Sequence, residues 1–356
     1  MSATASHAGS RWNKDENRAG ELNARKCGSR SAFWEVSEHW RTGGKCALFW
    51  YMPALATLDP AARLGPELAR QRLALEAVLW KRKQHSHSAR LIRATVKTGL
   101  AVLGLSRRAY RNFLDVRLVE NVVRIPSLPP AFQGFRLLQI TDLHSDLDPQ
   151  LIDRVIGLLQ KVSFDQCVLT GDYHNEIGTP WDRSMEHTLR LIPHLGTDPL
   201  GVPGNHDFLA KFSILEEGGL RMLLNESVSL ERNGARLWIC GVDDAHLFRT
   251  HDLEAACRDI PAAECRILLS HTPETWQEAA RLGYALHLSG HTHGGQICLP
   301  GGYPVIRKAA VPRALLAGPW REGDMAGYTS RGTGSCSVPA RLNCPPEITL
   351  HILRRS

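Results

Sequence analysis

Five short apolar runs between residues 135 and 290 each end in polar side chains, and this pattern constrains the fold more than any other feature of the sequence. Short apolar runs with such ends are typical of buried strands. Because sites are often assembled from distant segments at strand ends, we expect the polar clusters to meet. They contain carboxylate, imidazole and amide groups but no thiol: Asp142, His144, Asp172, Asn205, His206, Asp207, His271, His291 and His293.

Strands and helices are predicted to alternate after residue 130. The pattern predicts helices over 151–161 and 185–194. It predicts strands over 135–140, 166–170, 199–202, 236–242, 266–270 and 347–353. Alternation on this scale favours an α/β architecture with helices packed outside sheets. A chain of 356 residues is long enough for one large domain and a smaller appendage.

The sequence before residue 131 has a different character. Residues 1–58 are predicted to be a flexible basic region, and residues 59–130 a helical extension that ends in a proline-containing linker. Helices are expected over 59–83 and 90–113. In the first helix, four leucines are expected on one face and the charged residues elsewhere: Leu64, Leu68, Leu75 and Leu79 against Arg70, Arg72 and Glu76. Residues 131–356 form the remaining domain, which holds every polar cluster.

Charge also separates these parts of the chain. Residues 1–130 carry 22 Lys and Arg against 10 Asp and Glu, whereas residues 131–356 carry 21 against 26. A basic face of this kind binds nucleic acid or anionic lipid, or is simply solvated. Because residues 1–130 contain no module with interleaved aromatic and basic residues, lipid is the favoured partner. The apolar stripe of residues 90–113 either lies on a membrane surface or docks on the larger domain.

Cysteine spacing and hydropathy favour a cytoplasmic protein. The nine cysteines are scattered without a Cys-x-x-Cys pair, which argues against a disulfide framework and for a reducing compartment. The first 45 residues lack the apolar core of a signal peptide. The apolar run 46–58 has 13 residues, whereas about 20 are needed to span a bilayer. We therefore expect a cytoplasmic protein that associates peripherally with the inner face of the membrane.

The chemistry of the polar clusters is that of a metal-dependent hydrolase. Hydrolysing a phosphate ester requires neutralising its charge and producing hydroxide near neutral pH, and two divalent cations do both. Such a pair needs a carboxylate that bridges the ions, and Asp172, directly after a glycine, suits this role. Asp142 and His144 are one residue apart and can converge on one ion. His291 and His293 have the same spacing and can serve the two ions separately.

In this order, the clusters resemble the signature of the calcineurin-like metallophosphoesterases over residues 135–356. The motifs that carry the resemblance are Asp142-x-His144, Gly171-Asp172, Gly204-Asn205-His206-Asp207, His271 and Gly290-His291-x-His293. The segments 330–334, 339–341 and 344–349, with Gly-Gly-Gln after His293, resemble the YkuE-like bacterial branch of that family.

The resemblance implies a four-layer α/β/β/α sandwich with two divalent metal ions at the strand ends. The implied ligands of the first ion are Asp142, His144, Asp172 and His293. Those of the second ion are Asp172, Asn205, His271 and His291. It also implies that His206 protonates the leaving group and that Asp207 orients its ring. Two further residues are candidates for contacts with substrate phosphate: His174 and Arg331.

The implied activity is hydrolysis of a phosphodiester or pyrophosphate by a hydroxide that bridges the metal ions. The mixed ligands suit Mn²⁺, Fe or Zn²⁺, and we expect Mn²⁺ to support activity in vitro. A membrane lipid is one expected substrate, and a UDP-2,3-diacylglucosamine-type pyrophosphatase of lipid A synthesis is the alternative. A metal-binding scaffold of the same fold is another, although here every ligand position is filled. The acidic balance of residues 131–356 argues against nucleic acid. Oligomeric state stays open.

Overall fold

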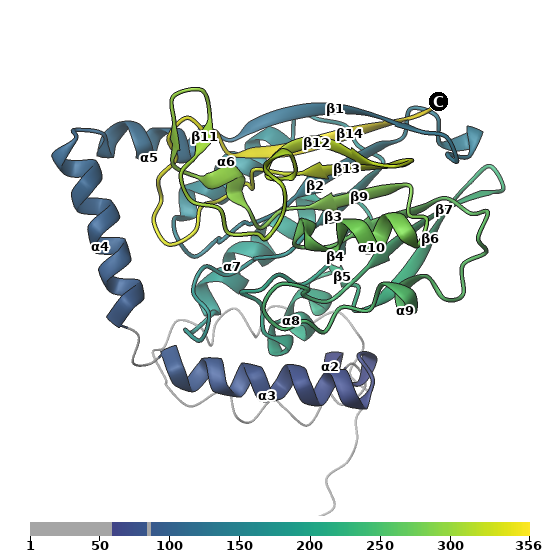
Figure 1. Cartoon of the computed structure of the whole chain (residues 1–356), viewed down its shortest axis with the longest axis horizontal. Coiled ribbons are helices and arrows are strands. Elements are labelled where there is room, and N and C mark those ends of the chain that lie inside the picture. The colour runs from purple at the N-terminus through teal and green to yellow at the C-terminus, as the bar shows by residue number, and fades with distance from the viewer. Residues whose placement is uncertain (1–58, 84–86) are drawn as a thin grey trace, which may run out of the picture. The chain divides into compact units, whose positions relative to one another are not determined.

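The computed structural model describes residues 59–83 and 87–356, which belong to one compact unit, Leu55–Ser356. The predicted flexible region, residues 1–58, lies outside the described residues, and so does the apolar run 46–58. Figure 1 shows how the helices and strands of this unit are arranged.

Two mixed sheets of six strands form the centre of the described residues. The first sheet has the order β1-β14-β2-β3-β4-β5, in which β14 is antiparallel to β2 and the other neighbours are parallel. Its strands are β1 (Arg117–Ile125), β2 (Arg136–Ile140), β3 (Gln166–Leu169), β4 (Leu200–Gly201), β5 (Arg221–Met222) and β14 (Glu347–Arg355).

The second sheet has the order β12-β13-β9-β8-β7-β6, with antiparallel pairs at both edges and parallel pairs between them. Its strands are β6 (Glu226–Arg232), β7 (Ala235–Gly241), β8 (Arg266–Leu269), β9 (Leu286–Ser289), β12 (Gly318–Glu322) and β13 (Met325–Thr329). A separate short hairpin follows β9 in the chain and consists of β10 (Cys298–Leu299) and β11 (Tyr303–Pro304).

Helices pack on the outer faces of both sheets. The described α-helices are α2 (Pro60–Arg63), α3 (Pro66–Lys83), α4 (His87–Val102), α5 (Ser106–Leu114), α6 (Pro149–Leu159), α7 (Asp182–Leu191), α8 (Phe212–Glu217), α9 (Leu253–Cys257) and α10 (Trp276–Arg281). Alternate residues of β2 explain the layering, because successive side chains of a strand point to opposite faces. Leu138 packs in the apolar cluster that contains residues of α6 and α7, whereas Leu137 packs against residues of the second sheet.

Three apolar clusters therefore separate the layers, one between the sheets and one beneath the helices on each outer face. The cluster between the sheets joins Leu137 and Val168 of the first sheet to Ile239 and Ile267 of the second. The outer face of the second sheet is covered by α9 and α10, which contribute Ala256 and Ala279. The predicted α/β fold is confirmed, with two mixed sheets.

The first sheet begins earlier in the chain than the sequence predicts. The segment predicted as a helical extension and linker, residues 59–130, contains β1, which pairs in parallel with β14 along its whole length (Figure 1). Val123 and Ile125 of β1 are buried between the two sheets. A domain boundary at residue 131 is therefore wrong, because it leaves out a strand that completes the sheet and its core.

Each of the two helices predicted before residue 114 is divided by a glycine. Gly65, with φ of 76°, separates α2 from α3, and Gly104, with φ of 69°, separates α4 from α5. This left-handed conformation is readily adopted only by glycine and ends a helix.

Helix α3 also differs from its predicted pattern. Arg72 and Glu76 are buried, whereas Leu73 and Val78 are exposed. The spacing of four residues places Arg72 and Glu76 on the same stripe as Leu68, so two charged residues face the body of the protein. The expectation that they lie on another face of this helix is wrong.

Helix α4 docks on the rest of the unit through part of its apolar stripe. Val96 and Leu100 pack against the buried cluster that contains Ala109, Ala340 and Leu342. Docking, one of the two alternatives that the sequence leaves open, therefore accounts for these two side chains. Among the described residues, no helix has both the length and the apolar character needed to cross a membrane.

Candidate metal centre

The polar clusters meet where the carboxyl ends of strands from both sheets come together. Strands β2, β3 and β4 are mutually parallel, as are β8 and β9, so the loops that follow them leave the same edge of each sheet. The seven predicted metal ligands lie in these loops and are all buried: Asp142, His144, Asp172, Asn205, His271, His291 and His293.

Most of these residues have a backbone conformation that side chains rarely adopt. Five of the seven have a positive φ, between 41° and 67°: Asp142, His144, Asp172, His291 and His293. A left-handed residue outside glycine costs about 1–3 kcal/mol and persists only where the surrounding structure imposes it. Here it turns the chain sharply after each strand, so that side chains from separate loops converge.

Two motif glycines make this convergence possible. A Cβ atom on Gly204 would collide with the carboxylate of Asp172, and one on Gly290 would collide with Thr141 and the carboxylate of Asp142. The loops therefore approach the carboxylates so closely that only glycine fits at these two positions.

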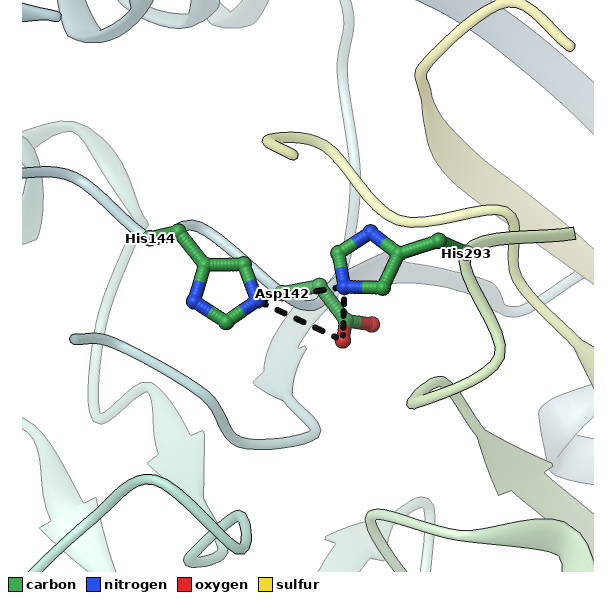
Figure 2. A group of neighbouring side chains, drawn as sticks. All are labelled: Asp142, His144 and His293. Atoms are coloured by element: carbon green, nitrogen blue, oxygen red, sulfur yellow. Dashed lines mark hydrogen bonds and ion pairs between the residues drawn. The ribbon is translucent and has the colours of Figure 1, made fainter. Parts of the chain in front are cut away.

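Asp142 and two imidazoles form the first compact group (Figure 2). Oδ1 of Asp142 lies 3.2 Å from Nε2 of His293 and 4.0 Å from Nε2 of His144. The two Nε2 atoms are 3.1 Å apart, and the rings are stacked. Three potential ligand atoms are thus gathered around one point.

Asp172 joins this group to a second one. Its Oδ2 lies 3.6 Å from Nε2 of His144 and 3.3 Å from Nε2 of His271. The same His271 nitrogen is 3.1 Å from Oδ1 of Asn205. Ligand atoms of Asp172, His271 and His291 lie within 4.8 Å of one another. A single carboxylate therefore lies within reach of both groups.

Backbone carbonyls fix how two of the rings are turned. Nδ1 of His144 donates to the carbonyl of His174 at 2.9 Å, and Nδ1 of His271 donates to that of Thr170 at 2.7 Å. A ring held in this way presents Nε2 to the cluster, which is the common arrangement for histidines that bind metal ions.

The charges of the cluster are strongly coupled. Burial lowers the pKa of His291 and of His293 well below the usual range, so both rings are neutral near pH 7. Burial raises the pKa of Asp172, but His271 outweighs it and holds that pKa well below its usual range. Burial also lowers the pKa of His271, but Asp172 outweighs it and raises the pKa to about 10. A cation that binds here displaces the His271 proton.

The donor atoms fit divalent metal ions. Oδ1 of Asp142 and Nε2 of His291 are buried and make no hydrogen bond. A buried polar atom without a partner costs about 1–3 kcal/mol, so an unexplained pair in one cluster points to a ligand that satisfies both. Carboxylate, imidazole and amide donors around a shared Asp172 suit two cations such as Mn²⁺, Fe²⁺ or Zn²⁺.

His206 lies at the cluster, but Asp207 does not orient its ring. Nε2 of His206 is 3.9 Å from Oδ2 of Asp172, and Nδ1 donates to the carbonyl of Asn175 at 2.6 Å. The Asp207 carboxylate instead accepts backbone N–H groups, from Asp172 at 2.8 Å and from Gly204 at 3.0 Å. The predicted orienting contact is therefore wrong, and Asp207 holds two metal-ligand loops together.

The two predicted substrate contacts have different surroundings. The His174 ring is buried, with Nδ1 3.0 Å from the Ser184 hydroxyl and Nε2 2.8 Å from that of Thr179. Both ring nitrogens thus have partners inside the protein, and the predicted contact with substrate stays a prediction. Arg331 is half-buried and donates to Glu347 at 2.5 Å. Its predicted contact with phosphate stays a prediction.

Two buried arginines support the centre without having been assigned a role from the sequence. Arg341 donates to the carbonyl of His293 at 3.0 Å, and its position in the 339–341 motif was the only available signal. Arg72 of α3 donates to the carbonyl of Asp207 at 2.5 Å. Its partner is 135 residues away in the chain, so no local pattern could have found it.

Comparison with known proteins finds a matching family and several similar relatives. Residues 135–295 match the model of the calcineurin-like phosphoesterase family. The chain is 30% identical to the phosphodiesterase YaeI of Escherichia coli over 236 residues, which are 61% of this chain and 81% of that protein. It is 29% identical to the metallophosphoesterase YkuE of Bacillus subtilis over 262 residues, 69% of this chain and 89% of that protein.

A similar relative occurs in an animal. The transmembrane protein with metallophosphoesterase domain of Danio rerio is 29% identical over 316 residues, which are 83% of this chain and 68% of that protein. The matched family segment begins just before β2 and ends just after His293, so it includes all seven predicted ligands.

Proposed function

Since this chain belongs to the calcineurin-like phosphoesterase family and is a phosphoesterase, we propose that it hydrolyses phosphodiesters or pyrophosphates with two metal ions held by the strand-end cluster. The observation that carries this proposal is the position of Asp172, whose carboxylate lies within reach of His144 on one side and His271 on the other. A carboxylate in that position is what two neighbouring cations share.

The proposed ligands divide into two sets around Asp172. The first ion is held by Asp142, His144, Asp172 and His293. The second ion is held by Asp172, Asn205, His271 and His291. When bound, two divalent cations offset the negative charge of the phosphoester and lower the pKa of a water molecule. We propose Mn²⁺ as the ion that supports activity.

His206 is the proposed proton donor to the leaving oxygen. Its Nδ1 is held by the carbonyl of Asn175, so Nε2 is the nitrogen available to substrate. Burial lowers the pKa of His206 to about 3, so the ring is neutral in the free chain. A phosphoester anion bound against it raises that pKa and supplies the protonated ring that general-acid catalysis needs.

The metal requirement is tested on the full chain. Elemental analysis of the purified protein is expected to find close to two metal ions per chain. Treatment with EDTA should abolish hydrolysis of bis(p-nitrophenyl) phosphate, and added Mn²⁺ should restore it. Metal binding without hydrolysis of any phosphodiester, nucleotide or pyrophosphate would favour the metal-binding scaffold, and absence of both would refute the metal centre.

We propose a lipid-borne phosphoester as the substrate class, because an exposed apolar hairpin leaves the loop that carries His293. The β10–β11 hairpin, residues 298–306, exposes four large apolar side chains: Leu299, Tyr303, Val305 and Ile306. Arg307 and Lys308 follow and are also exposed. Apolar side chains next to cations favour an anionic lipid surface. In the same proposal, the chain works at the inner face of the membrane.

The base of this hairpin is fixed close to the centre. The 3-10 turn η5 (His293–Gly295) precedes it, and the Cys298 thiol donates to the carbonyl of Gly294 at 3.2 Å. The Cys298 amide donates to the carbonyl of Leu342 at 2.9 Å. A lipid surface that contacts the hairpin therefore lies near the metal ligands, which suits either a phospholipid or a UDP-2,3-diacylglucosamine-type pyrophosphate.

Flotation with vesicles that contain anionic phospholipid tests this substrate class. V305S/I306S in the hairpin is expected to weaken binding by about 30-fold, since each side chain contributes about 1 kcal/mol on transfer into lipid. Matched pairs of exposed residues are L118S/V122S on β1 and V102S/L103S on α4. Loss of binding with the α4 pair, and not with the hairpin pair, would assign the contact to α4. A wild-type chain that fails to float would refute the proposal.

A further inference from the structure

We propose that Arg72 of α3 is a positioning residue for His206, an inference that rests on the proposed function of that histidine. Arg72 comes from the extension outside the matched family segment, yet its guanidinium is completely buried beside the loop that carries His206. Nη2 donates to the carbonyl of Asp207 at 2.5 Å. The contact is made to the residue that directly follows His206 in the chain.

Helix α3 holds this loop at a second point. The Glu76 carboxylate accepts the backbone N–H of Leu209 at 2.9 Å and also accepts Nε of Arg72 at 3.1 Å. One side chain of α3 therefore holds a carbonyl of the loop and another holds an amide two residues further on. The two side chains are joined to each other, so the backbone from Asp207 to Leu209 is clamped against α3 as a unit.

The guanidinium itself is fixed on its remaining sides. Nη1 forms an ion pair with Asp243, 3.4 Å from its Oδ1, but makes no hydrogen bond, and Cζ lies 3.3 Å from the centre of the Phe248 ring. A planar guanidinium presents its donors in a rigid fork, so partners on several sides fix both its position and its tilt. A lysine ammonium at this position keeps the charge but cannot satisfy the same directions.

The clamp acts on the loop of His206, whose ring is the proposed proton donor. His206 is otherwise held by three contacts: its Nδ1 donates to the carbonyl of Asn175, its backbone N–H donates to Oδ1 of Asp172 at 2.9 Å, and its carbonyl accepts Nζ of Lys211 at 2.8 Å. Displacement of a reacting group by about 1 Å can cost about 100-fold in rate. Releasing the Asp207 carbonyl therefore moves the ring relative to a leaving oxygen. The Asp207 carboxylate keeps its contacts with the amides of Asp172 and Gly204, and none of the seven proposed metal ligands is removed.

The test exploits the fact that a proton donor matters most for a poor leaving group. R72K is expected to lower kcat by roughly 10- to 100-fold on a phosphodiester with an alkyl leaving group, and by less than about threefold on bis(p-nitrophenyl) phosphate. KM and metal content should not change. In the His206→Ala background, R72K should have almost no further effect, because the group on which it acts is gone.

Arg63 of α2 supplies a matched control. It is also an arginine of the extension with two carboxylate partners, Glu216 and Glu226, but it contacts neither His206 nor its loop. R63K should reproduce any loss of stability without the dependence on leaving group. If R72K proves unstable, Phe248→Leu removes the ring beneath the guanidinium and should give a smaller effect of the same kind.

Three results would overturn the inference. They are equal losses on both leaving groups, a full effect of R72K in the His206→Ala background, and the same kinetic change in R63K. Each of these results can be obtained while the wild-type chain binds metal and hydrolyses phosphodiesters. The proposed function would then stay intact. A wild-type chain without metal and without hydrolysis would refute the proposed function instead.

Discussion

Helix α3 and the β10–β11 hairpin depart from the usual distribution of residues in opposite directions. Helix α3 buries Arg72 and Glu76 and exposes Leu73 and Val78. The hairpin exposes apolar side chains, among them Ile306 with 64% of its surface accessible. Charged residues are almost never buried without partners, and clustered exposed apolar residues mark contact surfaces.

The two regions differ in whether the unusual side chains have partners inside the protein. The buried charges of α3 are matched inside the protein, by Asp243 and by backbone groups of the His206 loop. In the described part of the chain, no apolar partner covers Val305 and Ile306, which follow β11 and are exposed. In the two proposals, the buried charges of α3 position His206, and the exposed apolar side chains of the hairpin contact a lipid surface.

The largest effect is expected at Asp172, the proposed ligand of both metal ions. Asp172→Asn should lower kcat/KM by more than about 1000-fold on soluble and lipid substrates alike, because both proposed metal sites lose a charged ligand. Metal content, measured by elemental analysis, should fall with activity. Full metal content with lost activity would mean that Asp172 is not a shared ligand.

Removing one of the two buried carboxylates beside Arg72 should be the next largest effect. Asp243→Ala leaves Glu76 as the remaining carboxylate at the buried guanidinium, and breaking a buried ion pair costs about 3–5 kcal/mol. The free energy of unfolding, measured with urea, should fall by that amount. A loss below about 1 kcal/mol would mean that the charges of α3 are effectively solvated, and the contrast with the hairpin would fail.

The smallest effect is expected in the hairpin. V305S/I306S should change the free energy of unfolding by less than about 0.5 kcal/mol, as exposed substitutions usually do. Hydrolysis of bis(p-nitrophenyl) phosphate should stay within about twofold of wild type. A clear loss of stability in the urea experiment would show that these side chains pack within the protein, so that they do not form a free surface.

The candidate centre could be predicted because its signals are local. Each ligand follows a short apolar strand, as Asp172 follows β3 and His271 follows β8. The spacing of these polar residues can be recognised in the sequence without knowledge of how the side chains pack. The helices around β3 and β4 were predictable for the same reason, since α6 and α7 have clear apolar periodicity.

Other features depend on partners far away in the chain. Arg72 looks like a solvated residue until Asp207 and Asp243 are placed beside it. Strand β1 was not predicted within the extension because its pairing partner, β14, is far away in the chain. The carboxylate of Asp207 is aimed by the fold at the amides of Asp172 and Gly204, and not at the neighbouring ring.

The pairing of β1 with β14 has a consequence for synthesis on the ribosome. Strand β14 lies between β1 and β2, so the first sheet is completed by a segment that is translated after every other described strand. Asn121 and His351, which contact each other across this pair at 3.1 Å, are 230 residues apart. Until β14 has left the ribosome, β1 and β2 lack the neighbour that joins them, which leaves an open edge for chaperones to shield.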